Sequence, residues 1–165
     1  MNQKKFLIVL GVVLLLVCGT FYIVDQQARE EKYERWVEIW SCLEFDIEPD
    51  TITVKEVPMN ATINATIFNP TDSDLELIIY SEPREIDKVY IGIDELVPIT
   101  KGWQNKLFVK AFEYKILSIK IRIEGMPDSI PKGLEHNWVY VIYVRLKNVT
   151  FDSPVRSSNF ALKFV

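Results

Sequence analysis

The chain has few of the residues that most often build catalytic or metal sites. Only one of its 165 residues is a histidine and only two are cysteines. The single histidine, His136, excludes multi-histidine metal sites, and no nucleophile elbow accompanies it. We interpret His136 as a loop residue, and we expect a protein that is not an enzyme and uses neither a cofactor nor a metal.

Basic residues are scarce as well. Lysine and arginine total 19 against 23 acidic residues, which gives a net charge of −4 at pH 7. A chain without a surplus of cations cannot neutralise phosphates in bulk, so we expect no nucleic-acid partner. With 48% apolar residues the chain is too hydrophobic to be disordered, and two cysteines are too few for a disulfide scaffold.

Much of the apolar content lies in one run near the amino terminus. Residues 6–24 include 16 apolar residues among 19 and carry no charge. As a helix this run would be about 28 Å long, close to the ~30 Å hydrocarbon core of a membrane. It predicts a transmembrane helix over 6–24, with membrane lipid as its partner, and a cytoplasmic tail over 1–5. A cleaved signal peptide and a lipoprotein processed at Cys18 are the alternatives.

Three glycosylation sequons indicate the side of the membrane on which the rest of the chain lies. They begin at Asn60, Asn64 and Asn148. Together with the short amino-terminal tail, they predict a single-pass protein of the cell membrane whose carboxy-terminal domain is extracytoplasmic. Because Cys18 lies inside the predicted span, it cannot readily pair with Cys42, which is left free or paired with another chain.

A juxtamembrane amphipathic helix is predicted over residues 25–42. Four residues of this stalk follow the i, i+3, i+4, i+7 spacing of an apolar helix stripe: Tyr33, Trp36, Val37 and Trp40. The stripe has two interpretations. It packs against the domain that it carries, or it joins two copies of the chain as a homo-oligomer that Cys42 can lock.

From residue 43 to residue 165 the pattern changes to the alternation that is typical of β-strands. Isoleucine and valine number 36 against five alanines, a composition that favours pleated sheets. Alternating runs predict strands at 61–67, 75–79, 89–93, 107–111, 117–123, 138–146 and 160–164. Seven to nine such strands with turn signals between them indicate an all-β, antiparallel sandwich of the immunoglobulin or fibronectin-III kind. We expect 138–146 to be the central strand and 160–164 the last edge strand.

Few residues of the predicted sandwich stand out as candidates for binding. Trp103 follows a turn glycine and is the residue we expect on a ligand-binding surface, whereas we expect Phe108 or Phe112 in the core. Acidic residues cluster at 72–74 and at 94–95. Neither cluster has the ligand count or the glycine of an EF-hand, so we interpret both as solvated acids of turns.

A longer motif extends from residue 51 to about residue 154. A strand of small and apolar residues ends in an Asn-Pro pair, and an acidic turn and further short segments follow: Asn69-Pro70, Leu75 to Tyr80, Val89-Tyr90-Ile91-Gly92, Val97-Pro98-Ile99 and Gly102. This order resembles the water-stress family of late embryogenesis abundant proteins, the LEA type 2 or WHy domain. The resemblance implies a fibronectin-III-like sandwich with a supporting helix and no catalytic residues.

The anchor, the sequons and the strands predict a membrane-anchored, non-catalytic module, and the resemblance implies a role in stress protection or surface binding. The alternative is a structural or assembly subunit of a cell-surface complex that self-associates through the stalk helix over 25–42. Only four glutamines accompany abundant isoleucine, glutamate and lysine, a composition that indicates a thermophile and fits an archaeal surface.

Overall fold

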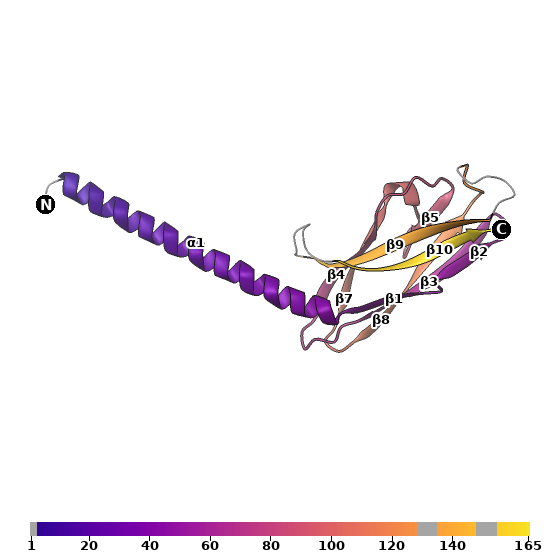
Figure 1. Cartoon of the computed structure of the whole chain (residues 1–165), viewed down its shortest axis with the longest axis horizontal. Helices are drawn as coiled ribbons and strands as arrows, with labels where there is room; N and C mark the ends of the chain where they lie inside the picture. Colours follow the sequence, from indigo (N-terminus) through magenta and orange to yellow (C-terminus); the bar gives the residue numbers. More distant parts are fainter. Residues whose placement is uncertain (1–2, 129–134, 148–154) are drawn as a thin grey trace. The chain divides into compact units, whose positions relative to one another are not determined.

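The structure is a computed structural model that describes residues 3–128, 135–147 and 155–165 (Figure 1). Within the helix, the side chains of residues 3–10, 12, 32 and 36 lie outside the description. The chain divides into two compact units, Met1–Ile39 and Trp40–Val165.

One helix, α1 (Gln3–Cys42), accounts for the first unit and continues to the start of the second. An ion pair one turn apart on its surface joins Arg29 Nη2 to Asp25 Oδ2 at 2.7 Å. Among the described residues, no helix is both long enough and apolar enough to cross a membrane. The predicted span over 6–24 includes residues whose side chains lie outside the description, so it stays a prediction.

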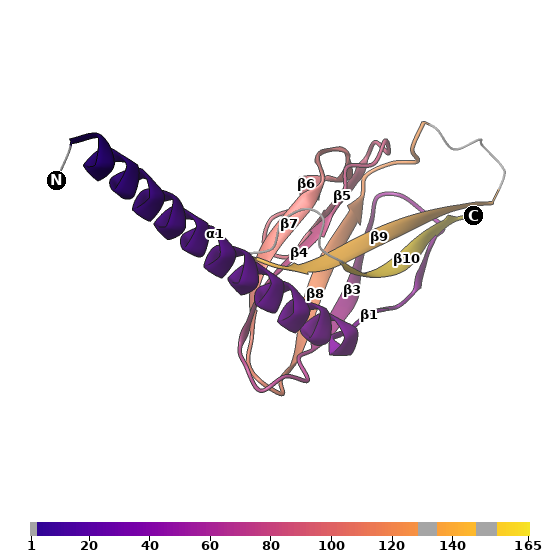
Figure 2. The same cartoon turned by 60° about the vertical axis from the view of Figure 1, so that its left-hand side comes forward.

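The second unit consists of two five-stranded sheets that pack face to face (Figures 1 and 2). Sheet A has the strand order β1 (Glu44–Glu48), β3 (Met59–Phe68), β8 (Tyr114–Ile123), β5 (Val89–Gly92) and β6 (Val97–Pro98). Sheet B has the order β2 (Thr51–Val54), β10 (Arg156–Phe164), β9 (His136–Leu146), β4 (Leu75–Ser81) and β7 (Trp103–Val109). A short 3-10 helix, η1 (Ile99–Lys101), precedes β7. The unit is a β-sandwich, as the sequence predicts.

The alternation of apolar residues decides which face of each strand enters the core. In β3 the side chains of Ile63 and Ala65 have no exposed surface, whereas Asn60 and Asn64 are exposed. Ile63 lies opposite Ile119 of β8, which is equally buried. Each buried isoleucine contributes about 1.5–3 kcal/mol, so a slip of one residue, which would expose them and bury the asparagines, is strongly disfavoured. The predicted register of this strand is confirmed.

The predicted central strand is confirmed, but the predicted edge strand is wrong. β9 lies in the middle of sheet B, between β10 and β4. β10 is not an edge strand, because β2 pairs with its other side, and this pair is parallel. Ala161 N donates to Asp50 O at 2.7 Å, and Val165 N donates to Val54 O at 3.2 Å. Because of this parallel pair, the sandwich is not wholly antiparallel. The pair forms because the chain leaves sheet A after β1 and enters sheet B as β2.

Two predicted strands extend beyond the observed strand ends, and the other five observed strands are longer than predicted. β5 ends at Gly92 instead of residue 93, and β7 covers Trp103–Val109 instead of 107–111. The second difference arises because Ala111 belongs to the turn after β7, where its N–H donates to Asp74 Oδ1 at 2.9 Å. Strands β1, β2 and β6 are not among the predicted strands. They have five, four and two residues, which are too few to form a recognisable alternating pattern.

Asn69, at the end of β3, is a buried hydrogen-bonding centre. Its side chain has no exposed surface. Its Nδ2 donates to three carbonyl oxygens, those of Ser73 at 2.8 Å, Lys110 at 2.9 Å and Val109 at 3.4 Å. Its Oδ1 accepts from Thr71 N at 3.1 Å and from Thr71 Oγ1 at 2.7 Å. One amide thus joins the turn after β3 to the turn after β7.

Two glycines of the motif lie where a larger residue would not fit. A Cβ atom on Gly92 would lie 1.9 Å from the backbone oxygen of Glu95, in the turn between β5 and β6. Gly102 has a φ of 70°, and its Cβ would lie 3.0 Å from the backbone oxygen of Ser81. A positive φ and a close backbone approach are both conditions that favour glycine.

Arg156, the first residue of β10, holds the end of the helix within the second unit. Its Nε donates to Trp40 O at 3.1 Å and its Nη2 donates to Ser41 O at 2.9 Å. The guanidinium also lies over the Trp40 ring, 5.6 Å from the centroid. The last turn of α1 has no basic residue of its own, so Arg156 supplies the cation that stabilises the helix carboxy terminus.

Replacing Arg156 by alanine removes both hydrogen bonds and the contact with the Trp40 ring. We expect Arg156→Ala to lower the free energy of unfolding by about 1–2 kcal/mol, because one of the two bonds is exposed to water. Urea unfolding followed by circular dichroism measures the change. Ser157→Ala, at an exposed neighbouring position, is the control, and equal stability of the two variants would contradict the role of Arg156.

Candidate functional site

The outer surface of sheet B has an aromatic and aliphatic face. Six outward-pointing residues of β4 and β9 form it, and we call it the tyrosine face: Ile78, Tyr80, Val139, Val141, Tyr143 and Arg145. Val139 is 51% exposed and the other five are half-buried. Contiguous apolar side chains on a surface, unlike single ones, are typical of a site that meets a partner.

Two stacked tyrosines lie at the centre of this face. Tyr80 and Tyr143 are opposite each other in the β4–β9 register, and their ring centroids are 5.2 Å apart. The guanidinium of Arg145 lies over the Tyr80 ring, 5.5 Å from the centroid. Burial raises the pKa of Tyr80, and it outweighs the opposing charge of Arg145. The Tyr80 phenol is therefore neutral at physiological pH and can donate a hydrogen bond.

The edge strand beside this face, β7, has side-chain partners for its own backbone. Asn105 Oδ1 accepts from Lys106 N at 2.7 Å, and Lys115 Nζ donates to Phe108 O at 2.7 Å. Open backbone groups on an edge strand invite pairing with a strand of another chain. Pairing of another strand through the Lys106 N–H or the Phe108 carbonyl would therefore first have to break one of these two bonds.

Two of the three predicted glycosylation acceptors lie on the opposite sheet. Asn60 and Asn64 are exposed on the outer side of β3 in sheet A, and Ser118 Oγ donates to Asn64 Oδ1 at 3.2 Å. Asn148 lies outside the described residues. Glycans on Asn60 and Asn64 would extend from sheet A and leave the tyrosine face of sheet B uncovered. Their attachment stays a prediction.

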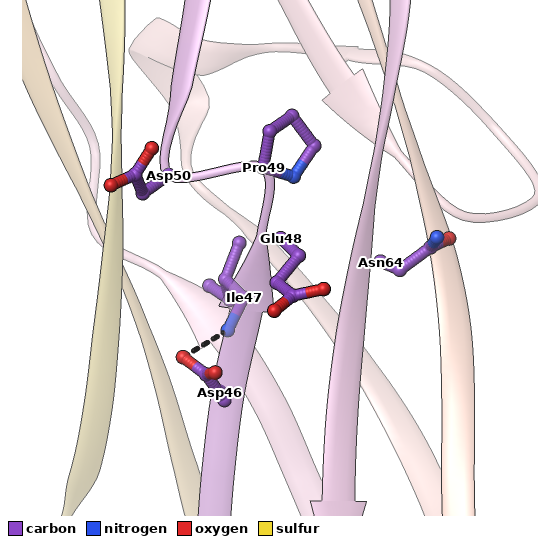
Figure 3. Close-up of a pocket in the computed structure, with 6 residues that line it drawn as sticks. All are labelled: Asp46, Ile47, Glu48, Pro49, Asp50 and Asn64. Atoms are coloured by element: carbon purple, nitrogen blue, oxygen red, sulfur yellow. Dashed lines mark hydrogen bonds between the residues drawn. The ribbon is translucent and has the colours of Figure 1, made fainter.

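A shallow depression of about 590 Å³ lies where β1 ends and the chain crosses toward β2 (Figure 3), and six residues line it: Asp46, Ile47, Glu48, Pro49, Asp50 and Asn64. The carboxylates do not converge, since those of Asp46 and Asp50 point to one side of β1 and that of Glu48 points toward Asn64 (Figure 3). Asp46 Oδ1 already accepts from Ile47 N at 2.8 Å. Within the described residues, no three acidic, histidine or cysteine side chains are arranged to hold a metal ion.

The expected positions of three aromatic residues are reversed. Trp103, predicted on a ligand-binding surface, is only 7% exposed, whereas Phe108 and Phe112, predicted in the core, are 46% and 65% exposed. The reason is the register of β7, which turns Trp103 inward opposite Ser81 and therefore turns Phe108 outward. Phe112 lies in the following turn with a φ of 57°. Trp103 still lines a small depression of about 200 Å³ at the start of β7.

The predicted self-association stripe of the stalk is only partly available. Tyr33 and Val37 are 55% and 42% exposed, and the side chain of Trp36 lies outside the described residues. Trp40 is 9% exposed and belongs to the second unit, where it contacts Arg156. The interpretation that the stripe packs on its own domain therefore holds for Trp40. The Cys42 thiol is exposed and free, so it remains available for a disulfide with another chain.

The other candidate residues, His136, Asp72 and Asp74, lie in a strand and in turns of the sandwich. His136 is the first residue of β9, not a loop residue, and its ring centroid lies 6.2 Å from that of Trp138. Asp72 Oδ1 accepts from Ser73 Oγ at 3.0 Å. Asp74 bonds the turn after β7, so both aspartates have the roles of turn acids that the sequence indicates.

Comparisons with known proteins give a likeness in fold. No family model matches the chain, and no curated protein sequence matches it. The N-terminal domain of PorA is 9% identical, covers 69% of this chain and 86% of its own length, and has a TM-score of 0.47. The CARDB domain of the PF1109 protein from Pyrococcus furiosus is 17% identical, covers 74% and 92%, and has a TM-score of 0.39. Sequence identities and TM-scores this low say nothing about a ligand or a partner of this chain. The resemblance to LEA type 2 proteins stays a prediction.

The tyrosine face was only half visible in the sequence. The 138–146 run has one apolar face, and on its opposite side lie the apolar residues Val139, Val141 and Tyr143. This second apolar face predicts that the strand is central. Nothing in the sequence places Tyr80 beside Tyr143, because that contact depends on the β4–β9 register across a separation of 63 residues. The second apolar face of the 138–146 run was therefore the only part of the site that the sequence indicated. The strand beside it, β4, is identified by the structure.

Proposed function

We propose that the chain is a non-catalytic binding module, anchored in a membrane by residues 6–24, that displays its β-sandwich outside the cytoplasm. The observation that supports it is the tyrosine face, an apolar surface on sheet B, while the described sequons lie on sheet A. In this proposal glycans cover one sheet and the other sheet meets a protein partner. A role in stress protection or surface binding follows from the resemblance to LEA type 2 proteins.

A second candidate function is that of an assembly subunit whose stalk helices associate. The exposure of Tyr33 and Val37 and the free thiol of Cys42 favour it. In such an assembly we expect Cys42 to form a disulfide with a second copy in an oxidising compartment, where no other described cysteine is available outside the predicted span. Loss of a disulfide-linked dimer in Cys42→Ser on a non-reducing gel would identify that contact.

The topology on which the first proposal rests has a direct test. Protease added to intact cells is expected to digest the sandwich, and mass analysis is expected to find glycans on Asn60 and Asn64. Thr62→Ala and Thr66→Ala are matched controls, because each removes one sequon and leaves its asparagine in place. A domain that resists protease until the cells are lysed, with unmodified asparagines, would overturn the extracytoplasmic placement.

A further inference from the structure

The tyrosine face and its borders carry charges in an order that is complementary to itself. Ile78 lies between Arg145 and Lys106 in the register of β9, β4 and β7, so both cations lie in one row across the sheet. The next row contains the stacked pair of Tyr80 and Tyr143. Rows on one face are about 6.6–6.8 Å apart, since side chains alternate along a strand.

An acidic residue lies on the other side of the aromatic row. Glu82 follows the last residue of β4 and is exposed. It is close enough to Tyr80 for its charge to act on the phenol, as does the charge of Arg145. For Arg145 and Lys106, the two tyrosines and Glu82, the order along the strand direction is therefore basic, aromatic, acidic. Glu76, one row before Ile78, forms an ion pair with Lys147, and Lys101 lies beside Tyr80 in a small depression.

A two-fold axis that passes through the aromatic row exchanges the two sides of this pattern. It would place Glu82 of one copy over Ile78 of the other, between Arg145 and Lys106, and the tyrosines of both copies at the centre. Such self-complementarity is what a symmetric dimer interface requires. We propose that the partner of the tyrosine face is a second copy of this chain, docked through sheet B with antiparallel strands; this deepens the proposed function and rests on it.

The chemistry of the face agrees with that occupant. Tyrosine and arginine are enriched among the residues that carry most of the energy of interfaces, and here they form the centre. Charged side chains at the border of such a centre select the partner and its orientation. The face lies on sheet B, whereas the exposed asparagines Asn60 and Asn64 lie on sheet A, so glycans there would leave the tyrosine face open for a contact between copies.

The experiment uses the full chain, purified in detergent micelles and with Cys42→Ser to remove any disulfide. Sedimentation equilibrium is expected to show a reversible dimer. Arg145→Glu and Glu82→Arg are each expected to weaken the dimer by at least about tenfold, because each places like charges opposite one another. An equimolar mixture of the two variants is expected to restore association, since the mixed pair has opposite charges at both contacts.

Two further variants keep the result clear. Lys106→Glu reverses an exposed charge of the same row without touching the Tyr80 ring contact of Arg145, and it is expected to weaken the dimer in the same direction. Lys120→Glu, an exposed reversal on sheet A, is expected to have no effect. Circular dichroism confirms that every variant is folded.

Three outcomes would overturn the inference. They are a wild-type chain that is monomeric at every concentration, a dimer unaffected by the charge reversals, and a mixture that associates no better than its components. Protease protection on intact cells does not depend on self-association. A failure of the dimer with an extracytoplasmic domain would therefore leave the proposed function standing, with a different protein as partner.

Discussion

Asn69→Ala is expected to lower the free energy of unfolding by about 3–5 kcal/mol, a large part of the stability of a domain of this size. The substitution leaves the carbonyl oxygen of Lys110 and the N–H of Thr71 without their amide partner, next to an Asn69 side chain that has no exposed surface. The carbonyl oxygen of Ser73 also loses its bond to the amide but still accepts from Thr71 Oγ1. Each of these partly buried groups costs up to about 1–3 kcal/mol when it loses its partner. Urea unfolding followed by circular dichroism measures the loss.

The control lies on β3, the strand that Asn69 follows. Asn60→Ala removes an exposed amide of β3 and is expected to change the stability by less than about 0.5 kcal/mol. If the two variants unfolded at the same urea concentration, the hydrogen bonds of Asn69 would not matter for stability.

Asn69→Asp tests the direction of those hydrogen bonds through pH. The new carboxylate would face three carbonyl oxygens instead of donating to them, and burial and this environment would raise its pKa above that in the unfolded chain. A raised pKa in the folded state means that the folded state binds the proton more tightly. The variant is therefore expected to be least stable near neutral pH and to recover relative to the wild type as the pH falls through the raised pKa. A constant difference across pH would contradict this arrangement.

Gly92→Ala is expected to cost at least about 3 kcal/mol or to unfold the β5–β6 hairpin. The added Cβ would lie 1.9 Å from the backbone oxygen of Glu95, and a backbone atom cannot move aside as the end of a side chain can. Thermal unfolding followed by circular dichroism measures the effect.

Gly125→Ala is the matched control for this substitution. There the nearest atom is Cδ of Lys88 at 3.0 Å, part of a flexible side chain that can move, so we expect a change of about 1 kcal/mol or less. Equal unfolding temperatures for the two alanine variants would show that the turn after β5 relaxes freely.

The residues on which the predicted resemblance to LEA type 2 proteins rests have roles in the backbone of the sandwich. Asn69 donates hydrogen bonds to backbone carbonyl groups. Gly92 and Gly102 lie where another part of the backbone comes too close for a Cβ atom. The Asn-Pro pair marks a strand end in the sequence. The bonds from Asn69 to residues 40 and 41 positions away become visible only when the turn after β7 is in place.

The sequence predicted those features of the fold that depend on the alternation of residues within one strand. Strict alternation was enough to orient β3 and β8, and a second apolar face was enough to place β9 at the centre of sheet B. The parallel pair of β2 with β10 was missed because β2 has four residues and its partner begins 105 residues later. Trp103 was misplaced for a related reason, since a turn glycine does not tell which face the following strand turns inward.

The bonded backbone of β7 has a consequence for crowding. Chains held in one membrane, as proposed for this protein, meet one another at a high local concentration, and open sheet edges would then pair repeatedly into aggregates. Asn105 and Lys115 bond the Lys106 N–H and the Phe108 carbonyl that such pairing would use. At these two positions of β7, pairing with a neighbouring chain would therefore first have to break an existing hydrogen bond.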